Sequence, residues 1–163
     1  MRRLSLDPGV RAVGWALWSD VGRLLEAGCS RAPKHYSPSE TVAHHSRQIP
    51  SGEAVIVEEM VWRHGDVRSQ SRDLLTVQLV GCTLAGILSS TGIVVHLPAA
   101  EWKGRVPKNI HHPRIVAALT DGEPEVLSRG LEGVPKTNRK EVLDAVGIGL
   151  YHLDRIDKAG RAR

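Results

Sequence analysis

The pattern of apolar and polar positions along the chain predicts five short β-strands. Three follow closely on one another at residues 2–6, 12–18 and 23–29, and two more lie at residues 54–57 and 93–97. Asp20-Val21-Gly22 suits a hairpin turn between the second and third strands. The last two strands are apolar throughout, which is typical of strands that are buried on both faces of a sheet.

Capping signals and apolar periodicity predict four helices. The first is expected to begin with the capping box Ser37-Pro38-Ser39-Glu40 and to run to about Gln48. The others are expected from about Ser71 to Ser89, from Pro113 to Asp121, and from near Asn138. Residues 122–138 are rich in Gly and Pro, so we expect a loop there.

This order of elements predicts an α/β domain. Its sheet is a five-stranded mixed sheet, with three antiparallel strands followed by βα units, and its helices lie on both faces. At 163 residues the chain is long enough for one domain with a sizeable core. We assign residues 1–157 to that domain and residues 158–163 to a basic C-terminal tail, which we expect to fray.

Composition and charge narrow the class of protein. No apolar run approaches the roughly 18 residues of a membrane span, and we see no signal peptide, so we expect no membrane partner. Cys29 and Cys82 lack CxxC spacing; two isolated thiols suit a reducing compartment, and we expect a cytoplasmic protein, although one bridge between them stays open. A net charge of +4 and a pI near 9.4 favour a polyanionic partner, most commonly nucleic acid.

The basic side chains gather in particular segments. One stretch, from Arg63 to Arg72, follows the fourth strand, so we favour a DNA-contacting loop there over an ordinary solvated loop. The basic residues that we take as DNA contacts are Arg63, Arg68, Arg72, Lys103, Arg105 and Lys108. A further basic group, Arg155, Lys158, Arg161 and Arg163, ends the chain.

Carboxylates stand at equivalent places on three predicted elements. Asp7 ends the first strand, directly before a Pro-Gly turn, and Glu58 ends the fourth strand, which would lie beside the first in a parallel pair. Glu141 and Asp144 are three residues apart on the last helix and therefore share one face. If that helix packs across the carboxyl ends of the strands, the four acids meet and are suited to hold two Mg²⁺ ions for phosphodiester hydrolysis.

Each acid also has alternatives that stay open. Asp7 could simply belong to a turn, and Glu141 could be the N3 partner of a helix cap. Glu59 would point opposite to Glu58, so only one of them faces the site, and we favour Glu58 because it directly follows the apolar run. The adjacent pairs His44-His45 and His111-His112 point apart and do not favour a zinc site.

Three motifs resemble those of RuvC-type Holliday junction resolvases. They are Leu4-Ser5-Leu6-Asp7-Pro8-Gly9, Ile56-Val57-Glu58-Glu59-Met60, and the closing helix from Asp144 to His152. The resemblance implies an RNase H-like fold, a homodimer, and a magnesium-dependent crossover junction endodeoxyribonuclease that nicks four-way DNA junctions symmetrically. By position, Asp7, Glu58 and Asp144 match the metal-ligand motifs of that family.

Two positions depart from the family's pattern. Glu141 stands where the family usually has Asp or His; its extra methylene could favour Mn²⁺, which tolerates looser geometry than Mg²⁺. The aromatic residue that follows the strand glutamate in many relatives is not at Val61, and we place its counterpart, a DNA contact, at Trp62.

Two alternative functions and the position of the dimer interface stay open at this point. Alternatives are another RNase H-like nuclease that acts on branched DNA or RNA, and a non-catalytic nucleic-acid-binding relative; the intact acid set argues against the latter. Because a four-way junction offers two equivalent strands, a two-fold dimer could present one site to each. The apolar helix from about Ser71 to Ser89 is the candidate dimer interface.

Overall fold

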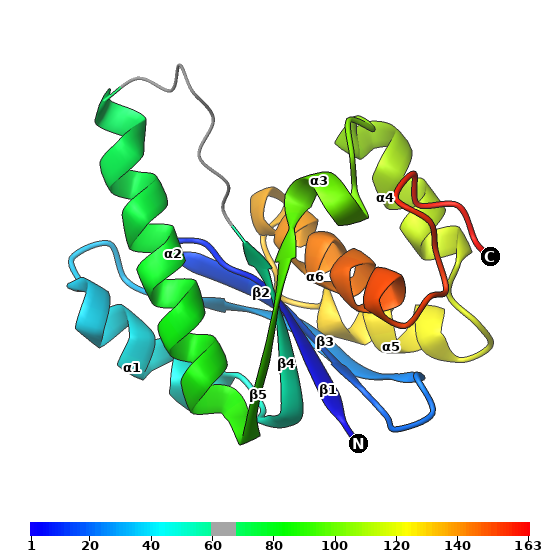
Figure 1. The fold of residues 1–163 in the computed structure, drawn as a ribbon, viewed down its shortest axis with the longest axis horizontal. Coiled ribbons are helices and arrows are strands. Elements are labelled where there is room, and N and C mark those ends of the chain that lie inside the picture. The colour runs from blue at the N-terminus through cyan, green and yellow to red at the C-terminus, as the bar shows by residue number, and fades with distance from the viewer. Residues whose placement is uncertain (60–67) are drawn as a thin grey trace.

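The computed structural model describes residues 1–59 and 68–163, with side chains in the second range from residue 73 onward. Its strands are β1 Arg3–Asp7, β2 Ala12–Trp18, β3 Leu24–Arg31, β4 Gly52–Glu59 and β5 Ser89–Pro98. They form one sheet in the order β3-β2-β1-β4-β5 (Figure 1). β2 pairs antiparallel with both β1 and β3, whereas β4 pairs parallel with both β1 and β5. The predicted mixed sheet is therefore confirmed.

Helices cover both faces of this sheet, as expected (Figure 1). They are α1 Pro38–Gln48, α2 Arg68–Leu88, α3 Ala99–Trp102, α4 Lys108–Ala117, α5 Glu123–Gly130 and α6 Arg139–His152, and a 3-10 turn, η1 Lys136–Asn138, precedes α6. α1 and α2 pack on one face; α6 and α5 pack on the other, with α3 and α4 against α6. None of the helices in the described part of the chain is long and apolar enough to cross a membrane.

The alternation of side chains along β1 decides which residues face α6. Leu6 is fully buried in the apolar core beneath α1 and α2. Ser5 faces the other side, where its hydroxyl donates a 2.7 Å hydrogen bond to the carbonyl oxygen of Ala145 in α6. Because successive strand residues point to opposite faces, Asp7 lies on the same side as Ser5. The carboxylate at the end of β1 is thus directed toward α6.

The observed helices differ from the predicted ones in three places. Residues 122–138, expected to be a loop, contain α5, which starts after Gly122 (φ 85°) and has Pro124 in its first turn and Leu127 buried beneath it. A proline in the first turn is a helix-start signal, and here it outweighs the high Gly and Pro content. The short helix expected to open at Pro113 is α4, which begins at Lys108 and contains Pro113 in its interior. The four-residue helix α3 was not predicted.

The end of the chain is folded, which corrects the expectation that it frays. Ile156 is fully buried and pairs with Ala162 in an antiparallel bridge. Arg114 of α4 donates a 2.9 Å hydrogen bond to the carbonyl oxygen of Ala159. We call residues 156–162 the C-terminal hairpin. Its apolar anchor lies within a polar, basic stretch, so the local sequence pattern did not reveal it.

Candidate metal centre

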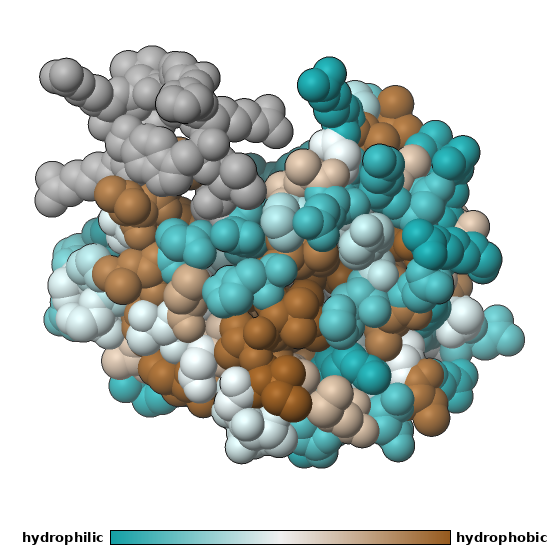
Figure 2. Space-filling model, viewed as in Figure 1, coloured by the Kyte–Doolittle hydropathy of each residue, from teal (hydrophilic) through white to brown (hydrophobic). Residues whose placement is uncertain are grey.

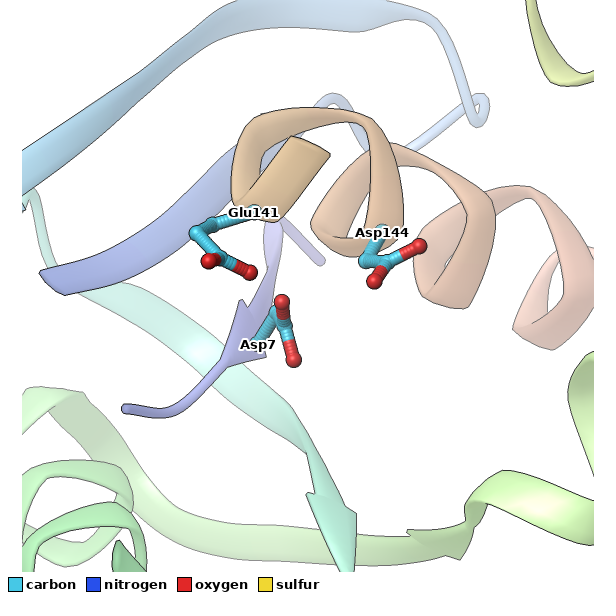
Figure 3. Close-up of side chains that lie close together, drawn as sticks. All are labelled: Asp7, Glu141 and Asp144. Atoms are coloured by element: carbon cyan, nitrogen blue, oxygen red, sulfur yellow. The ribbon is translucent and has the colours of Figure 1, made fainter. Parts of the chain in front are cut away.

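Three of the four predicted acids meet at one end of the sheet. One carboxylate oxygen from each of Asp7, Glu141 and Asp144 lies within 4.8 Å of the other two. Figure 3 shows these side chains pointing toward one another, Asp7 from the end of β1 and the other two from α6. Asp7 and Asp144 are buried, whereas the Glu141 side chain is 23% exposed. The cluster therefore has a closed side and a side that is open to solvent.

Gly14 allows α6, which carries Glu141 and Asp144, to approach the sheet closely enough for the acids to cluster. It lies opposite Asp7 in the antiparallel pair of β1 and β2. A Cβ atom at Gly14 would collide with the backbone carbonyl of Glu141, so the first turn of α6 rests directly on the backbone of β2. Glycine inside a strand is a recognised signal of such a close approach. From the sequence, the glycines around Asp7 were expected to admit a phosphate or a metal; the element that approaches Gly14 is instead the backbone of α6.

Glu58 joins the cluster from the neighbouring parallel strand. Its side chain is buried and shares a hydrogen bond with Asp7, whereas Glu59 is only partly buried and points to the other face. One Glu58 oxygen, Oε1, lies 2.7 Å from Nζ of Lys103. The same oxygen accepts a 3.3 Å hydrogen bond from the indole N–H of Trp102. Between the two adjacent glutamates, the geometry thus favours Glu58 as a member of the site.

The environment separates the pKa values of the two buried aspartates. Burial raises the pKa of Asp7 well above its usual range, and the charge and hydrogen bond of Glu58 raise it further. Burial also acts to raise the pKa of Asp144, but hydrogen bonds from His112 and Lys108 outweigh it and lower that pKa. Of these two aspartates, Asp144 is therefore the one that ionises more readily. A divalent cation would favour the ionised form of Asp7.

Basic side chains of the α3–α4 region contact two of the acids. Lys108 pairs with one oxygen of Asp144, and Nε2 of His112 lies 2.8 Å from the other. Lys103 pairs with Glu58. We expected Lys103 and Lys108 to be DNA contacts, and the structure places both at the acids. His112 was not among the predicted site residues, because only the packing of α4 against α6 brings it to Asp144.

The remaining predicted residues fall in different places. Arg105 is exposed on the α3–α4 connection. Arg68 and Arg72 lie at the start of α2, where only the backbone is described. Trp62 and Arg63 lie outside the described residues.

The helix-cap alternative for Glu141 is not supported by the geometry. Asn138 is the N-cap residue of α6, as expected from the sequence, but its side chain makes no capping hydrogen bond. The Glu141 carboxylate instead lies with Asp7 and Asp144. Oxygen ligands clustered in this way suit hard divalent cations, so the donor set fits Mg²⁺.

The sheet order, with α6 packed across the central strands, defines an RNase H-like fold. The chain is similar to T. thermophilus RuvC in complex with a Holliday junction substrate, with a TM-score of 0.56 and 19% identity over 94% of this chain and 92% of that chain. It is also similar to the fowlpox virus resolvase with its substrate Holliday junction DNA, with a TM-score of 0.55 and 15% identity over 94% of this chain and 97% of that chain.

A third solved structure, the yeast mitochondrial Holliday junction resolvase Ydc2, has a TM-score of 0.52 and 12% identity, over 90% of this chain and 76% of that chain. At these identities the likeness shows the fold alone, and it confirms the fold that the three sequence motifs implied. No family model matches the chain. No curated protein matches it either.

Proposed function

We propose that this protein is a magnesium-dependent, structure-selective DNA endonuclease that resolves four-way junctions by paired symmetric nicks. The observation that carries the proposal is the cluster of Asp7, Glu141 and Asp144 within 4.8 Å, in a fold shared with junction resolvases. A protein that only binds DNA gains nothing from clustered negative charge facing phosphate. Asp7, Glu58, Glu141 and Asp144 would hold two Mg²⁺ ions, with Mn²⁺ as a possible substitute. When bound, the ions stabilise the attacking and leaving oxygens of the phosphodiester.

The chain's own residues prepare the site for this chemistry. β1 and α6 hold the buried Asp7 and Asp144, so both ligands are positioned by regular secondary structure. The partly exposed side chain of Glu141 marks the side from which a DNA backbone approaches. Lys103 and Lys108 balance the negative charge of the acids and can donate to the oxygens of an incoming phosphate.

We also propose that two copies associate through α2. Leu75, Leu79 and Ile87 are 58%, 58% and 55% exposed, and their spacing places them on one face of α2. A groove of about 600 Å³ lies between α2 and α1; among its lining residues are Leu79, Thr83, Ile87 and Val42. Figure 2 shows apolar surface along α2 and over β5. Exposed apolar surface of this kind marks interaction sites, and a two-fold dimer would offer one active site to each of two equivalent junction strands.

The two cysteines favour a reducing compartment for the enzyme. Cys29 and Cys82 are both free thiols. Burial raises the pKa of the Cys29 thiol to about 11, so it stays protonated and unreactive at neutral pH. We therefore propose the cytoplasm as the location of the protein.

Substrate choice tests the proposed function. The protein is incubated with Mg²⁺ and, side by side, an intact four-way DNA junction, a Y-fork and an RNA hairpin. We expect symmetric nicks in the junction and little cleavage of the other two. Preferential cleavage of the fork or hairpin would instead indicate another RNase H-like nuclease. Binding of the junction without cleavage in any divalent metal would indicate a non-catalytic binding protein.

A further inference from the structure

The C-terminal hairpin has a fixed position beside the candidate metal centre. Besides the Ile156–Ala162 bridge, Arg114 of α4 donates to the carbonyl oxygen of Ala159. Gly160 is buried, and a Cβ atom there would lie 3.2 Å from the ring of His111. The hairpin is therefore packed against α4 through Gly160 and Ala159, and its Lys158 side chain is left exposed.

A short series of contacts connects this hairpin to Glu58. The ring of His111 packs edge-on against Trp102, with the ring centroids 5.2 Å apart. The indole N–H of Trp102 in turn donates to Oε1 of Glu58 at 3.3 Å. Two side chains thus separate the C-terminal hairpin from a predicted metal ligand, so its surface is held near the reaction site.

Arg105 and Lys158 line one hollow between the α3–α4 connection and the C-terminal hairpin. The hollow has a volume of about 610 Å³ and is lined by Ala100, Gly104, Arg105 and Lys158. Both basic side chains are exposed, and neither has an ion pair or hydrogen bond within the described residues. Arg161 and Arg163 differ, because they pair with Asp157 and Asp154. The hollow therefore carries two cations that are available to an anionic ligand.

The turn at Gly104 allows Lys103 and Arg105, on either side of it, to reach the acid cluster and the hollow respectively. The Gly104 φ of +54° lies in the left-handed region, which glycine adopts without steric cost. On one side of this turn Lys103 reaches Glu58, and on the other Arg105 reaches the hollow next to Lys158. Positive charge therefore continues from the acid cluster to the C-terminal hairpin.

We propose that Arg105 and Lys158 form a binding site for backbone phosphate of a DNA arm, next to the acid cluster but outside it. The inference rests on the proposed function, because the ligand is the same DNA. Contacts to phosphate set the register and orientation of DNA without reading its sequence. This site accordingly holds the arm that flanks the cleaved strand and positions that strand relative to the acids.

Salt dependence of binding tests this site directly. Binding to a fluorescent four-way junction is measured without divalent metal over a series of salt concentrations, for Asp7→Asn and for the same variant carrying Arg105→Ala, Lys158→Ala or both. The slope of log affinity against log salt is negative. Each lost phosphate contact should make it less steep by about 0.9, and the double replacement should make it less steep by about 1.8. Arg2→Ala is the matched control, because Arg2 is exposed near the start of β1, at the opposite end from Asp7; it should leave the slope unchanged.

The outcomes separate this site from the proposed function. An unchanged slope in the double variant, with melting temperatures equal to that of the parent and with junction cleavage by the wild-type protein, would overturn the phosphate site and leave the function standing. If the protein fails to bind or cleave junctions, the function is contradicted, and the same variants are titrated with linear duplex DNA. A reduced slope on duplex would support the phosphate site, and an unchanged slope would overturn it.

Discussion

Nζ of Lys103 lies 2.7 Å from Oε1 of Glu58, a buried carboxylate that we propose as a metal ligand. The ammonium group is also held over the ring of Trp102, 4.7 Å from its centroid. A lysine in this position compensates the charge of the acid cluster. It therefore competes with any cation that binds there.

Replacing Lys103 by Met should strengthen metal binding in the absence of DNA. Removing a positive charge beside the acids lowers the repulsion of a divalent cation, and we expect the affinity for Mn²⁺ to rise by about tenfold. Titration of Mn²⁺ followed by electron paramagnetic resonance measures this without any cleavage step. Arg2→Met is the charge-matched control at the far end of β1. An affinity equal to or weaker than that of the wild type would contradict the placement of Lys103.

The Glu141→Gln substitution should impair cleavage and leave stability nearly unchanged. The structure gives Glu141 no capping hydrogen bond partner at Asn138, and its carboxylate lies within the acid cluster. Loss of a residue that only supports a metal ligand costs up to roughly 100-fold, so for a direct ligand we expect the rate in Mg²⁺ to fall by at least roughly 100-fold, with a smaller loss in Mn²⁺. Cleavage rates in both metals and the melting temperature are measured together. Full activity in Mg²⁺ would reduce the site to three acids.

Glu123 provides a prediction on the pH dependence of stability. Burial alone would raise its pKa, but hydrogen bonds from Arg155 and from the backbone N–H groups of Leu24 and Thr120 lower it to about 2. The folded state therefore favours the carboxylate more than the unfolded state does, where the pKa is near 4.5. This stabilisation is fully present above pH 4.5 and is lost as the pH falls toward 2.

Replacing Glu123 by Gln should accordingly cost about 3 kcal/mol at pH 7, because it removes the negative charge that balances the guanidinium of Arg155. The melting temperature should fall by on the order of 10 °C. The difference from the wild type should shrink as the pH is lowered from 4.5 toward 2. Glu125→Gln, an exposed change on the same helix, is the control. A difference in melting temperature that stays constant with pH would contradict the assigned pKa shift.

A feature of the fold or of the acid cluster could be predicted from the sequence only where neighbouring residues in the chain determine it. Strands and their ends follow from short apolar runs and the turn residues after them, so Asp7 and Glu58 could be placed at the carboxyl ends of neighbouring strands. The spacing of Glu141 and Asp144, three residues apart on a predicted helix, was enough to place both side chains on one face of it. By contrast, His112 reaches Asp144 only because α4 packs against α6, and no local pattern carries that information.

The same distinction explains the errors in the fold. The C-terminal hairpin depends on burial of Ile156 and on a hydrogen bond from Arg114, about 45 residues earlier in the chain. Its own sequence is short, polar and basic, which is the usual pattern of a frayed end. α5 was missed for a different reason, because the proline that starts it was taken as a loop residue.

The dimer proposal predicts that Leu79→Glu produces a monomer. Leu79 is 58% exposed on the apolar face of α2, and a charge buried there in an interface would be strongly unfavourable. Light scattering at micromolar concentration should show a dimer for the wild-type protein and a monomer for this variant. Val21→Glu alters an exposed apolar residue in the β2–β3 turn and should leave the dimer intact. A monomeric wild-type protein would contradict the interface.

Cleavage by Asp7→Asn tests the central claim most directly. Asn keeps the volume of Asp but removes the charge that holds the metal, and losing about 4 kcal/mol of transition-state stabilisation corresponds to about a 10³-fold slower reaction. The measurement compares junction cleavage in Mg²⁺ by the wild type, Asp7→Asn and Glu59→Gln, whose side chain points to the other face of β4. We expect Asp7→Asn to bind the junction without cutting it and Glu59→Gln to cut it normally. Cleavage by Asp7→Asn near the wild-type rate would contradict the assignment of this acid cluster as the active site.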